Sequence, residues 1–298
     1  VRGAAAVALG EIGDRRAVEP LVKLLETDAE IEVRGRAAVA LGALKDPRAV
    51  PVLVKTLDAR EAPLRVYAVD ALGELGDRSV VERLSRMLLE DENAGVRESA
   101  AVALGKLGAP EAIGALKRAL KDNERKLQLL AFTALTDICR ADVQLLYRTA
   151  DELMTEGDYT HATSLLELLL ERAVDKPEHA RLLARARTRL ARCYLAGKQW
   201  AKAVKLLEDL KRANPDDVTI LKQYAVALSG AGRWSESFRQ YSDLARRTRT
   251  KDQTYWSERQ TLLETMMRHQ RYAQVLQLIE EVKRTETDIP ERVRTRSG

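Results

Sequence analysis

Arginines at helical spacing are the residues of this sequence whose pattern most directly suggests binding. In the segment ARLLARARTRLARCYL, Arg181, Arg185, Arg189 and Arg192 stand at i, i+4, i+8 and i+11, so a helix places them along one face. A row of guanidinium groups can receive an acidic protein segment. A solvated helix face with local ion pairs is the other interpretation of the same pattern.

Groups that make bonds or hold metals are scattered along the chain. The three histidines, His161, His179 and His269, fall in different expected helices without metal-ligand spacing around them. The sequence contains no glycine-rich phosphate loop and no Gly-x-Ser-x-Gly motif. We therefore expect no catalytic residue, no metal site and no bound cofactor, and a protein that is not an enzyme.

The two cysteines, Cys139 and Cys193, each lie in an Ala/Leu-rich helical pattern. This setting predicts buried, reduced thiols rather than a disulfide or a redox pair. Low cysteine content favours a reducing compartment. We expect a cytoplasmic protein, with the bacterial periplasm as the alternative.

Composition favours a soluble, helical protein. Of the 298 residues, 45% are hydrophobic and 32% charged, while only 4% are aromatic. The abundance of Ala and Leu favours helices that pack through small residues. No uncharged apolar run approaches the ~18 residues that a membrane-spanning helix needs, and the start shows neither an initiating Met nor a signal-peptide pattern.

A motif repeats through the first half of the chain. Copies such as VRGAAAVALGEI and VRGRAAVALGAL begin at residues 1, 33, 64, 96 and 127. A period of this length indicates stacked supersecondary units. Columns one, five, eight, nine and twelve of the motif are apolar, which is one face of an amphipathic helix. A second helical pattern, such as RRAVEPLVKLLE, separates the copies, so each unit is expected to be a helical hairpin.

This half of the chain resembles HEAT repeats of the short type found in phycobilisome lyases and many bacterial proteins. The resemblance assigns residues 1–142 to a HEAT-repeat domain. It also implies a ladder in which an aspartate before each motif helix pairs with the arginine of that helix, and which links the repeats. The expected pairs are Asp28 with Arg34, Asp58 with Arg65, and Asp91 with Arg97, and the ladder should lapse where Asp122 faces Gln128.

The chain opens inside a copy of the motif. Residues 1–13 correspond to the second helix of a hairpin whose first helix is absent from the sequence. The apolar face of Val1, Ala5, Ala8 and Leu9 therefore lacks its hairpin partner. We expect that this HEAT domain is incomplete at its N-terminus and that further repeats precede Val1 in the natural protein.

A different pattern follows from about residue 143. Four segments share an aromatic residue, a small or β-branched residue three positions on and a bulky apolar residue four further: Tyr159–Ala162–Leu166, Trp200–Ala203–Leu207, Trp234–Ser237–Tyr241 and Tyr272–Val275–Ile279. Residues 143–284 thus resemble tetratricopeptide repeats. Residues 285–298 read as a polar tail. Together the two patterns predict an all-α protein, an α-solenoid of helical hairpins in which a HEAT array continues into a tetratricopeptide array.

The resemblance to tetratricopeptide repeats implies where a partner would bind. Arg185 and Arg192 would face the groove in which such repeats grip peptides, and we add Arg189 and Lys222 to this candidate surface. Arg192 occupies the position where the chaperone-binding clamp needs Asn, so we do not expect chaperone-tail binding. In the HEAT half the expected inner-face columns are Gly35/Val39, Val66/Asp70 and Glu98/Val102, with Arg36 and Tyr67 alongside as candidate partner-binding residues.

These observations favour a non-enzymatic scaffold or adaptor that binds partner proteins on the concave surfaces of its solenoids, in the assembly of a larger bacterial complex. One alternative is a HEAT-type bilin lyase or isomerase subunit. A nucleic-acid backbone binder is the other, although residues 1–143 carry 22 basic and 23 acidic side chains and lack the basic stripe that phosphate contact requires.

Overall fold

The structure is a computed structural model that describes residues 1–173, 177–247 and 253–285. The described residues form seventeen α-helices, five short 3-10 turns and connecting loops, without a β-strand. The expectation of an all-α solenoid is thereby confirmed. The chain divides into two compact units between Leu153 and Met154, and each unit is described by itself.

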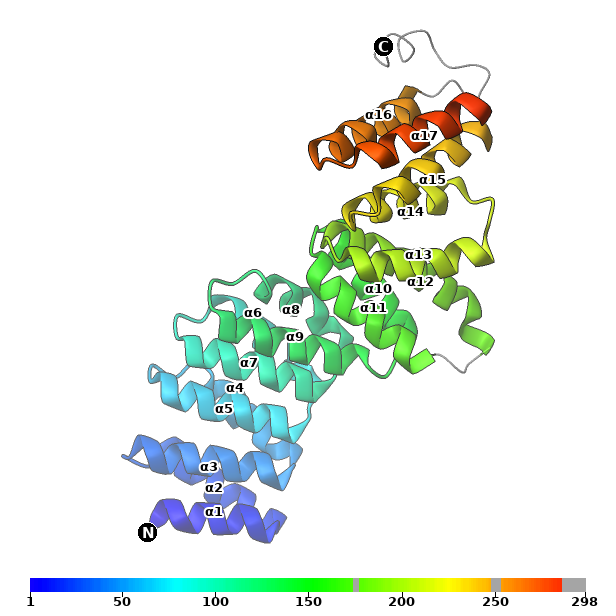
Figure 1. The fold of residues 1–298 in the computed structure, drawn as a ribbon. Helices are drawn as coiled ribbons and strands as arrows, with labels where there is room; N and C mark the ends of the chain where they lie inside the picture. The colour runs from blue at the N-terminus through cyan, green and yellow to red at the C-terminus, as the bar shows by residue number, and fades with distance from the viewer. Residues whose placement is uncertain (174–176, 248–252, 286–298) are drawn as a thin grey trace. The chain divides into compact units, whose positions relative to one another are not determined.

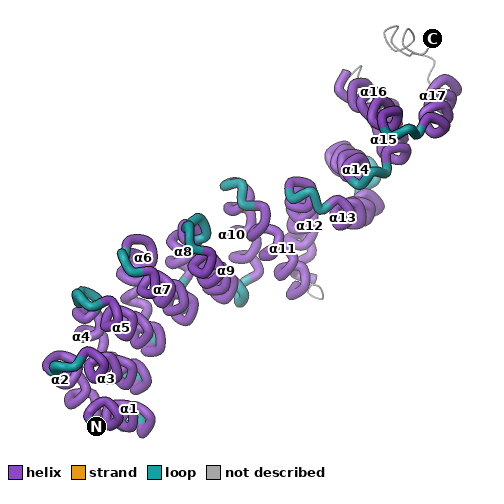
Figure 2. The backbone as a smooth tube through the Cα atoms, turned by 60° about the vertical axis from the view of Figure 1, so that its left-hand side comes forward, coloured by secondary structure: helices purple, strands orange, loops and turns teal. Residues whose placement is uncertain are grey.

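The first unit is a row of helical hairpins. Its helices are α1 (Arg2–Ile12), α2 (Val18–Thr27), α3 (Ile31–Leu44), α4 (Val50–Thr56), α5 (Ala62–Leu75), α6 (Val81–Glu90), α7 (Ala94–Leu107), α8 (Ile113–Ala119), α9 (Arg125–Cys139) and most of α10 (Val143–Thr155). We call α1, α3, α5, α7 and α9 the motif helices, because they carry the repeated motif, and α2, α4, α6 and α8 the linking helices. Each motif helix packs against the next, while the linking helices lie on the other side of the row (Figures 1 and 2).

Contacts between glycine and alanine hold the motif helices close together. A methyl group on Gly42 would lie 2.7 Å from the Cα atom of Ala71, and one on Gly73 would lie 2.9 Å from that of Ala103. Both distances are below any normal carbon–carbon contact, so only glycine fits. The same column supplies Gly10 against Ala40 and Gly105 against Ala134. Thr136 occupies this column in the last motif helix, so the series of Gly–Ala contacts ends with α9.

The turns after the motif helices repeat one arrangement. Gly13, Lys45, Gly76 and Gly108 end four of these helices with φ between 49° and 85°, which is the left-handed region that glycine adopts without a Cβ penalty. An aspartate follows in three of the four turns. The carboxylates of Asp14, Asp46 and Asp77 accept hydrogen bonds from the backbone N–H two residues on and start the 3-10 turn that leads into the linking helix.

The apolar columns of the motif are buried in α3, α5, α7 and α9, as the periodicity predicts, except that Leu75 in column twelve of α5 is half-buried. Leu41, Leu72, Leu104 and Leu135, all in column nine, are completely buried. In α1 the same face is open: Ala5, Ala8 and Ile12 are exposed and Leu9 is half-buried. The further repeats expected before Val1 stay a prediction.

The second unit is also built of hairpins. It contains α11 (Tyr159–Ala173), α12 (Ala180–Ala196), α13 (Trp200–Ala213), α14 (Val218–Gly230), α15 (Trp234–Arg247), α16 (Gln253–Arg268) and α17 (Tyr272–Thr285), and each of these helices packs against the next (Figure 1). Of the expected polar tail, residues 286–298 lie outside the described residues. The domain boundary expected between residues 142 and 143 falls at the start of α10, which continues through the division between the units.

Aromatic residues at the starts of the second helices join successive hairpins of this unit. The Trp200 ring, at the start of α13, covers Gly230 at the end of α14, where a Cβ atom would lie 2.4 Å from the indole. The Trp234 ring, at the start of α15, stacks on the His269 ring beyond α16 with centroids 4.7 Å apart. The aromatic residue of the repeat pattern therefore packs against the first helix of the following hairpin.

We expect Gly73→Ala to destabilise the first unit by about 1–3 kcal/mol, because the added methyl group would overpack two backbones that cannot separate without losing their neighbours. Gly114→Ala is the matched control, since Gly114 lies in α8 with no atom within 4 Å of the added Cβ. There the same change should leave stability unchanged or raise it by up to about 1 kcal/mol. Urea unfolding followed by circular dichroism measures both. Equal midpoints for the two variants would contradict the close-contact interpretation.

Candidate protein-binding surfaces

The ladder arginines bind backbone carbonyls before their own helices. Arg34 Nε donates to the carbonyl oxygen of Leu25 (2.9 Å), and Arg97 Nη1 donates to that of Asp91 (3.0 Å). Arg65 Nη1 reaches two carbonyls of the loop before α5, at 3.0 Å each. Each guanidinium group thereby satisfies carbonyls at or beyond the end of the preceding linking helix that have no partner within a helix.

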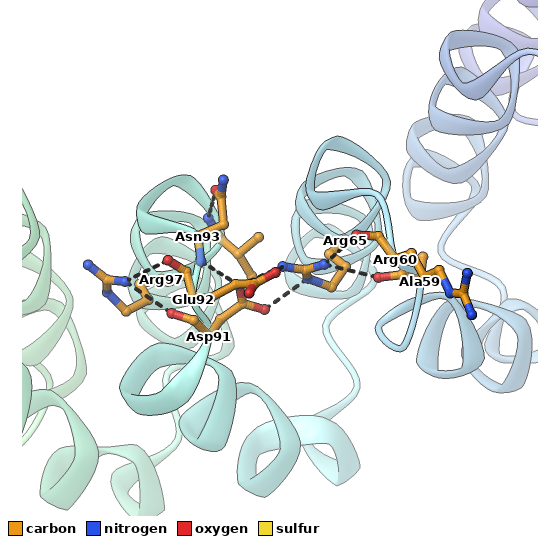
Figure 3. A network of polar contacts seen from close by, with 8 residues as sticks. Ala59, Arg60, Arg65, Asp91, Glu92, Asn93 and Arg97 are labelled. Carbon is orange, nitrogen blue, oxygen red and sulfur yellow. Dashed lines mark hydrogen bonds and ion pairs between the residues drawn. The ribbon is translucent and has the colours of Figure 1, made fainter.

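Two of the three ladder carboxylates, Asp28 and Asp91, pair with arginines of the preceding motif helix, which corrects the expected pairs. Asp91 binds Arg65 through two hydrogen bonds of 2.9 and 2.8 Å, and Asp28 binds Arg2 at 2.6 Å (Figure 3). Asp58 pairs with Arg83. The predicted partners Asp28–Arg34, Asp58–Arg65 and Asp91–Arg97 were therefore wrong, although the ladder does connect neighbouring repeats. The physical reason is that the arginine of the same repeat is already bound to backbone carbonyls. Asp28 and Asp91 therefore pair with the previous motif helix, and Asp58 pairs with the following linking helix, α6.

The ladder also continues where a lapse was expected. Gln128 Nε2 donates to the carbonyl oxygen of Asp122 at 2.6 Å, in the place of the arginine. Arg97 of the preceding repeat pairs with Glu124 at 2.7 Å instead of with Asp122. An amide is enough for the carbonyl contact, which needs a donor and no charge. These residues thus hold repeats together, and the described side chains of Arg65 and Asp91 are largely buried.

The two candidate binding residues of the first unit share one carboxylate. Arg36 Nε lies 3.0 Å from Oε1 of Glu32, and the Tyr67 hydroxyl donates to Oε2 of the same residue at 3.1 Å. These bonds lower the pKa of Glu32, with the Arg36 bond as the larger cause. The Tyr67 ring lies over Gly35, where a Cβ atom would be 2.2 Å from it. The polar groups of both candidates are therefore engaged within the first unit.

The arginine stripe lies on α12 as the spacing predicts. Arg181, Arg185 and Arg192 are exposed, whereas Arg189 is half-buried. No described acidic side chain forms an ion pair with Arg185 or Arg192. Helix α12 contains five arginines and no acidic residue, so its exposed face is cationic along its whole length.

Lys222 lies on the equivalent helix of the next hairpin. Trp200 and Trp234 hold the same repeat position 34 residues apart, and on this register Lys222 corresponds to Thr188, which falls between Arg185 and Arg192. Helices α12 and α14 are in contact. The Lys222 ammonium lies 5.9 Å from the centroid of the Tyr255 ring, within the range of a cation–π interaction. Arg185, Arg192 and Lys222 are all exposed, and on this register we group them as one surface, which we call the cationic face.

Both thiols are buried, as the sequence predicted. Burial raises the pKa of Cys193 to about 11 and also raises that of Cys139, whose sulfur lies 3.5 Å from the Thr149 hydroxyl. Each thiol is held in its protonated, unreactive form at neutral pH. Within the described residues, His, Cys, Asp and Glu do not gather in groups of three or more suited to a metal ion. No described helix is both long and apolar enough to cross a bilayer.

Sequence reasoning missed one buried charge in the second unit. Arg259 of α16 is only 3% exposed; its Nη1 donates to the Ser242 hydroxyl at 3.1 Å and its guanidinium lies 5.7 Å from the Phe238 ring. Helical spacing could have predicted this burial, because Arg259 falls on the same helix face as Tyr255, Leu262 and Met266. It packs α16 against α15 and belongs to the core of this unit rather than to the cationic face.

We expect Arg65→Ala to cost about 3 kcal/mol of folding free energy, because it leaves the buried carboxylate of Asp91 and two loop carbonyls without their donor. Arg83→Ala removes the exposed ion pair with Asp58 and should cost less than about 1 kcal/mol. Urea unfolding compares the two variants. A similar loss for both would contradict the structural role assigned to the buried pair.

Comparison with known proteins follows the division seen in the structure. A model of HEAT repeats matches residues 1–65 and 57–136, and a model of the tetratricopeptide repeat matches residues 153–223. The mouse protein DnaJ homolog subfamily C member 3 is 27% identical over 96 residues, which are 32% of this chain and 18% of that protein. The rat protein of the same name is 28% identical over 93 residues, which are 31% of this chain and 18% of that protein. This chain thus spans less than a fifth of either relative.

Two solved structures are similar to parts of this chain. One is the complex of CpcE and CpcF of phycocyanin lyase from Nostoc sp. PCC7120, with 20% identity, a TM-score of 0.40, and coverage of 63% of this chain and 87% of that chain. The other is the tetratricopeptide domain of P58(IPK), with 19% identity, a TM-score of 0.37, and coverage of 90% and 79%. The family models and the hairpins agree: this chain is a repeat protein in which HEAT repeats over residues 1–136 are followed by tetratricopeptide repeat sequence over residues 153–223.

Proposed function

We propose that this protein is a non-enzymatic adaptor that binds partner proteins in the assembly of a larger complex, and that its cationic face receives an acidic segment of one partner. The observation that carries the proposal is the charge of two neighbouring helices. Helix α12 contributes five arginines, α14 contributes Lys222, and neither helix contains a carboxylate.

The exposure of these cations supports binding rather than internal pairing. Arg185 and Arg192 are exposed and stand seven residues apart on α12, which corresponds to about 10 Å along a helix axis. An arginine fork can hold a carboxylate through two parallel hydrogen bonds, so two such forks can fix both position and orientation of an acidic segment. Unpaired cations of one sign also attract an acidic partner before contact is made.

An exposed apolar side chain lies on the second of these helices. Val226 of α14 is 38% exposed and stands one turn beyond Lys222. A partner segment that combines carboxylates with an apolar residue would gain both charge pairing and burial of this side chain. The mixed chemistry suits a protein segment, since a polyanion without apolar groups would leave Val226 exposed.

The state of the reactive side chains supports a non-enzymatic role. Both cysteine thiols have raised pKa values and are enclosed by the helices around them. The His161 ring is bound to Asp158 of the same turn at 2.7 Å, and the His269 ring is stacked on Trp234. These side chains are engaged in local packing and hydrogen bonding rather than gathered around a substrate-sized space.

We expect a fluorescein-labelled 12-residue peptide of alternating Glu and Ser to bind the full chain, and Arg192→Glu to weaken this binding at least about tenfold, a loss of ~1.4 kcal/mol. The reversed charge would repel the peptide at the centre of the cationic face. Rising salt should weaken binding to the unmodified chain, because these groups are exposed. Fluorescence anisotropy measures both effects.

Arg187→Glu is the matched control. Arg187 is exposed on the same helix, but it points about 200° away from Arg185 around the axis at ~100° per residue. The two variants carry the same net charge, so a loss confined to Arg192→Glu assigns the peptide to the cationic face. Equal losses, or equal binding of a Gln/Ser peptide, would refute the proposed acidic site.

A further inference from the structure

The motif helices present a row of exposed apolar side chains. Val39 of α3 is 45% exposed, Val102 of α7 38% and Leu129 of α9 65%. Val39 and Val102 occupy column seven of the motif, and Val66 and Leu129 occupy column three. Apolar side chains that are exposed in a row on neighbouring elements, rather than singly, indicate an interaction surface.

A carboxylate interrupts the valines of column seven. Asp70 of α5 holds column seven between Val39 and Val102. It is half-buried, and this burial is the main cause that raises its pKa. No described Lys or Arg forms an ion pair with it, because Lys106, the cation that acts on it, is bound to Glu74. A carboxylate in this setting lacks the partner that would offset its desolvation.

The spacing of the row is set by the Gly–Ala contacts. Gly42 against Ala71 and Gly73 against Ala103 bring α3, α5 and α7 as close as backbones allow, which corresponds to the short end of the ~8–10 Å range of helix separations. Val39, Asp70 and Val102 therefore repeat at roughly 8–9 Å across the three helices. A peptide that crosses the three helices must therefore place its contacting side chains at the same spacing.

Polyproline II conformation has this repeat. It places every third residue on the same side of the chain at about 3.1 Å per residue, or ~9.3 Å per turn. A β-strand returns to the same side after about 6.6 Å, and an α-helix places residues i and i+7 about 10.5 Å apart. Among these three conformations, polyproline II comes closest to the spacing of the row.

We propose that the row Val39–Asp70–Val102 binds a partner segment in polyproline II conformation whose side chains are apolar, basic and apolar at every third position. The two outer side chains cover the valines, and the basic side chain pairs with the carboxylate of Asp70. The pattern is symmetric about Asp70, so the segment can cross the helices in either direction. This surface lies in the first unit and is separate from the cationic face, although it rests on the same proposed adaptor function.

The test uses three labelled peptides that share a proline-rich frame, which is already in the required conformation. The first contains Leu-Pro-Pro-Lys-Pro-Pro-Leu. The second has Glu in place of Lys, and the third moves Lys by one position, to Leu-Pro-Lys-Pro-Pro-Pro-Leu. Binding to the full chain is measured by fluorescence anisotropy. The first peptide should bind at least tenfold more tightly than the other two.

Variants of the chain assign the charge recognition to Asp70. Asp70→Asn should weaken binding of the Lys peptide at least tenfold. Asp70→Lys should reverse the preference, so that the Glu peptide binds more tightly than the Lys peptide. Glu82→Gln is the control, because it removes one exposed carboxylate from the linking helix α6; it should change binding less than twofold. Val102→Ser, at an exposed site, should weaken binding of the Lys peptide several-fold while the midpoint of thermal unfolding stays unchanged.

Three results would overturn the inference. They are equal binding of the three peptides, no binding of any of them, and tighter binding of an α-helical peptide with Leu, Lys and Leu at heptad spacing. The acidic peptide of the cationic face is measured in parallel on the same variants. If Asp70→Lys leaves binding of the acidic peptide unchanged while the polyproline peptides fail to bind, only the proposed site at Val39–Asp70–Val102 is refuted, and the cationic face is not.

Discussion

The close approach of the motif helices is the constraint on which the first unit depends. In the motif helices that precede another motif helix, column ten is glycine, because at Gly42 and Gly73 the neighbouring alanine occupies the space of a side chain. The small contact brings two backbones together and lets the leucines of column nine be completely buried between hairpins. The same contact fixes the distance between equivalent positions on neighbouring helices. The buried Gly–Ala contacts therefore also set the spacing of the exposed side chains that repeat across these helices.

Polar contacts then fasten the helices that the glycines bring together. The arginine of each motif helix has two possible partners, the carbonyls before its own helix and a carboxylate of the following repeat. Arg65 satisfies both at once, with Asp91 on one side and the loop before α5 on the other (Figure 3). Since Arg65 and Asp91 are largely buried, the pair orders the repeats more than an exposed ion pair would. In the second unit aromatic rings at the starts of the second helices join the hairpins, as Trp200 does where it covers Gly230.

Both proposed surfaces lie where a position of the repeat carries a charged side chain that is not part of the apolar core. On α12, Arg185 and Arg192 are exposed, and no described acidic side chain forms an ion pair with either. On α5 the carboxylate of Asp70 replaces the valine of the neighbouring helices. By contrast, Arg36 and Tyr67 are similar in type to binding residues but share Glu32, so their polar groups contribute to the stability of the unit.

The repeat period and the apolar columns determined, without the structure, that the chain is a series of helical hairpins in two kinds of array, that Cys139 and Cys193 are buried, and that the arginines of α12 share a face. These properties are local, because helical periodicity and turn residues act within one hairpin. Only the tertiary structure decided that Asp91 binds Arg65 rather than Arg97, that Arg36 and Tyr67 are bound to Glu32, and that Arg259 is buried. Each of these depends on which side chain of the next helix comes within hydrogen-bond distance, and that distance is set by packing between repeats, which no single hairpin sequence contains.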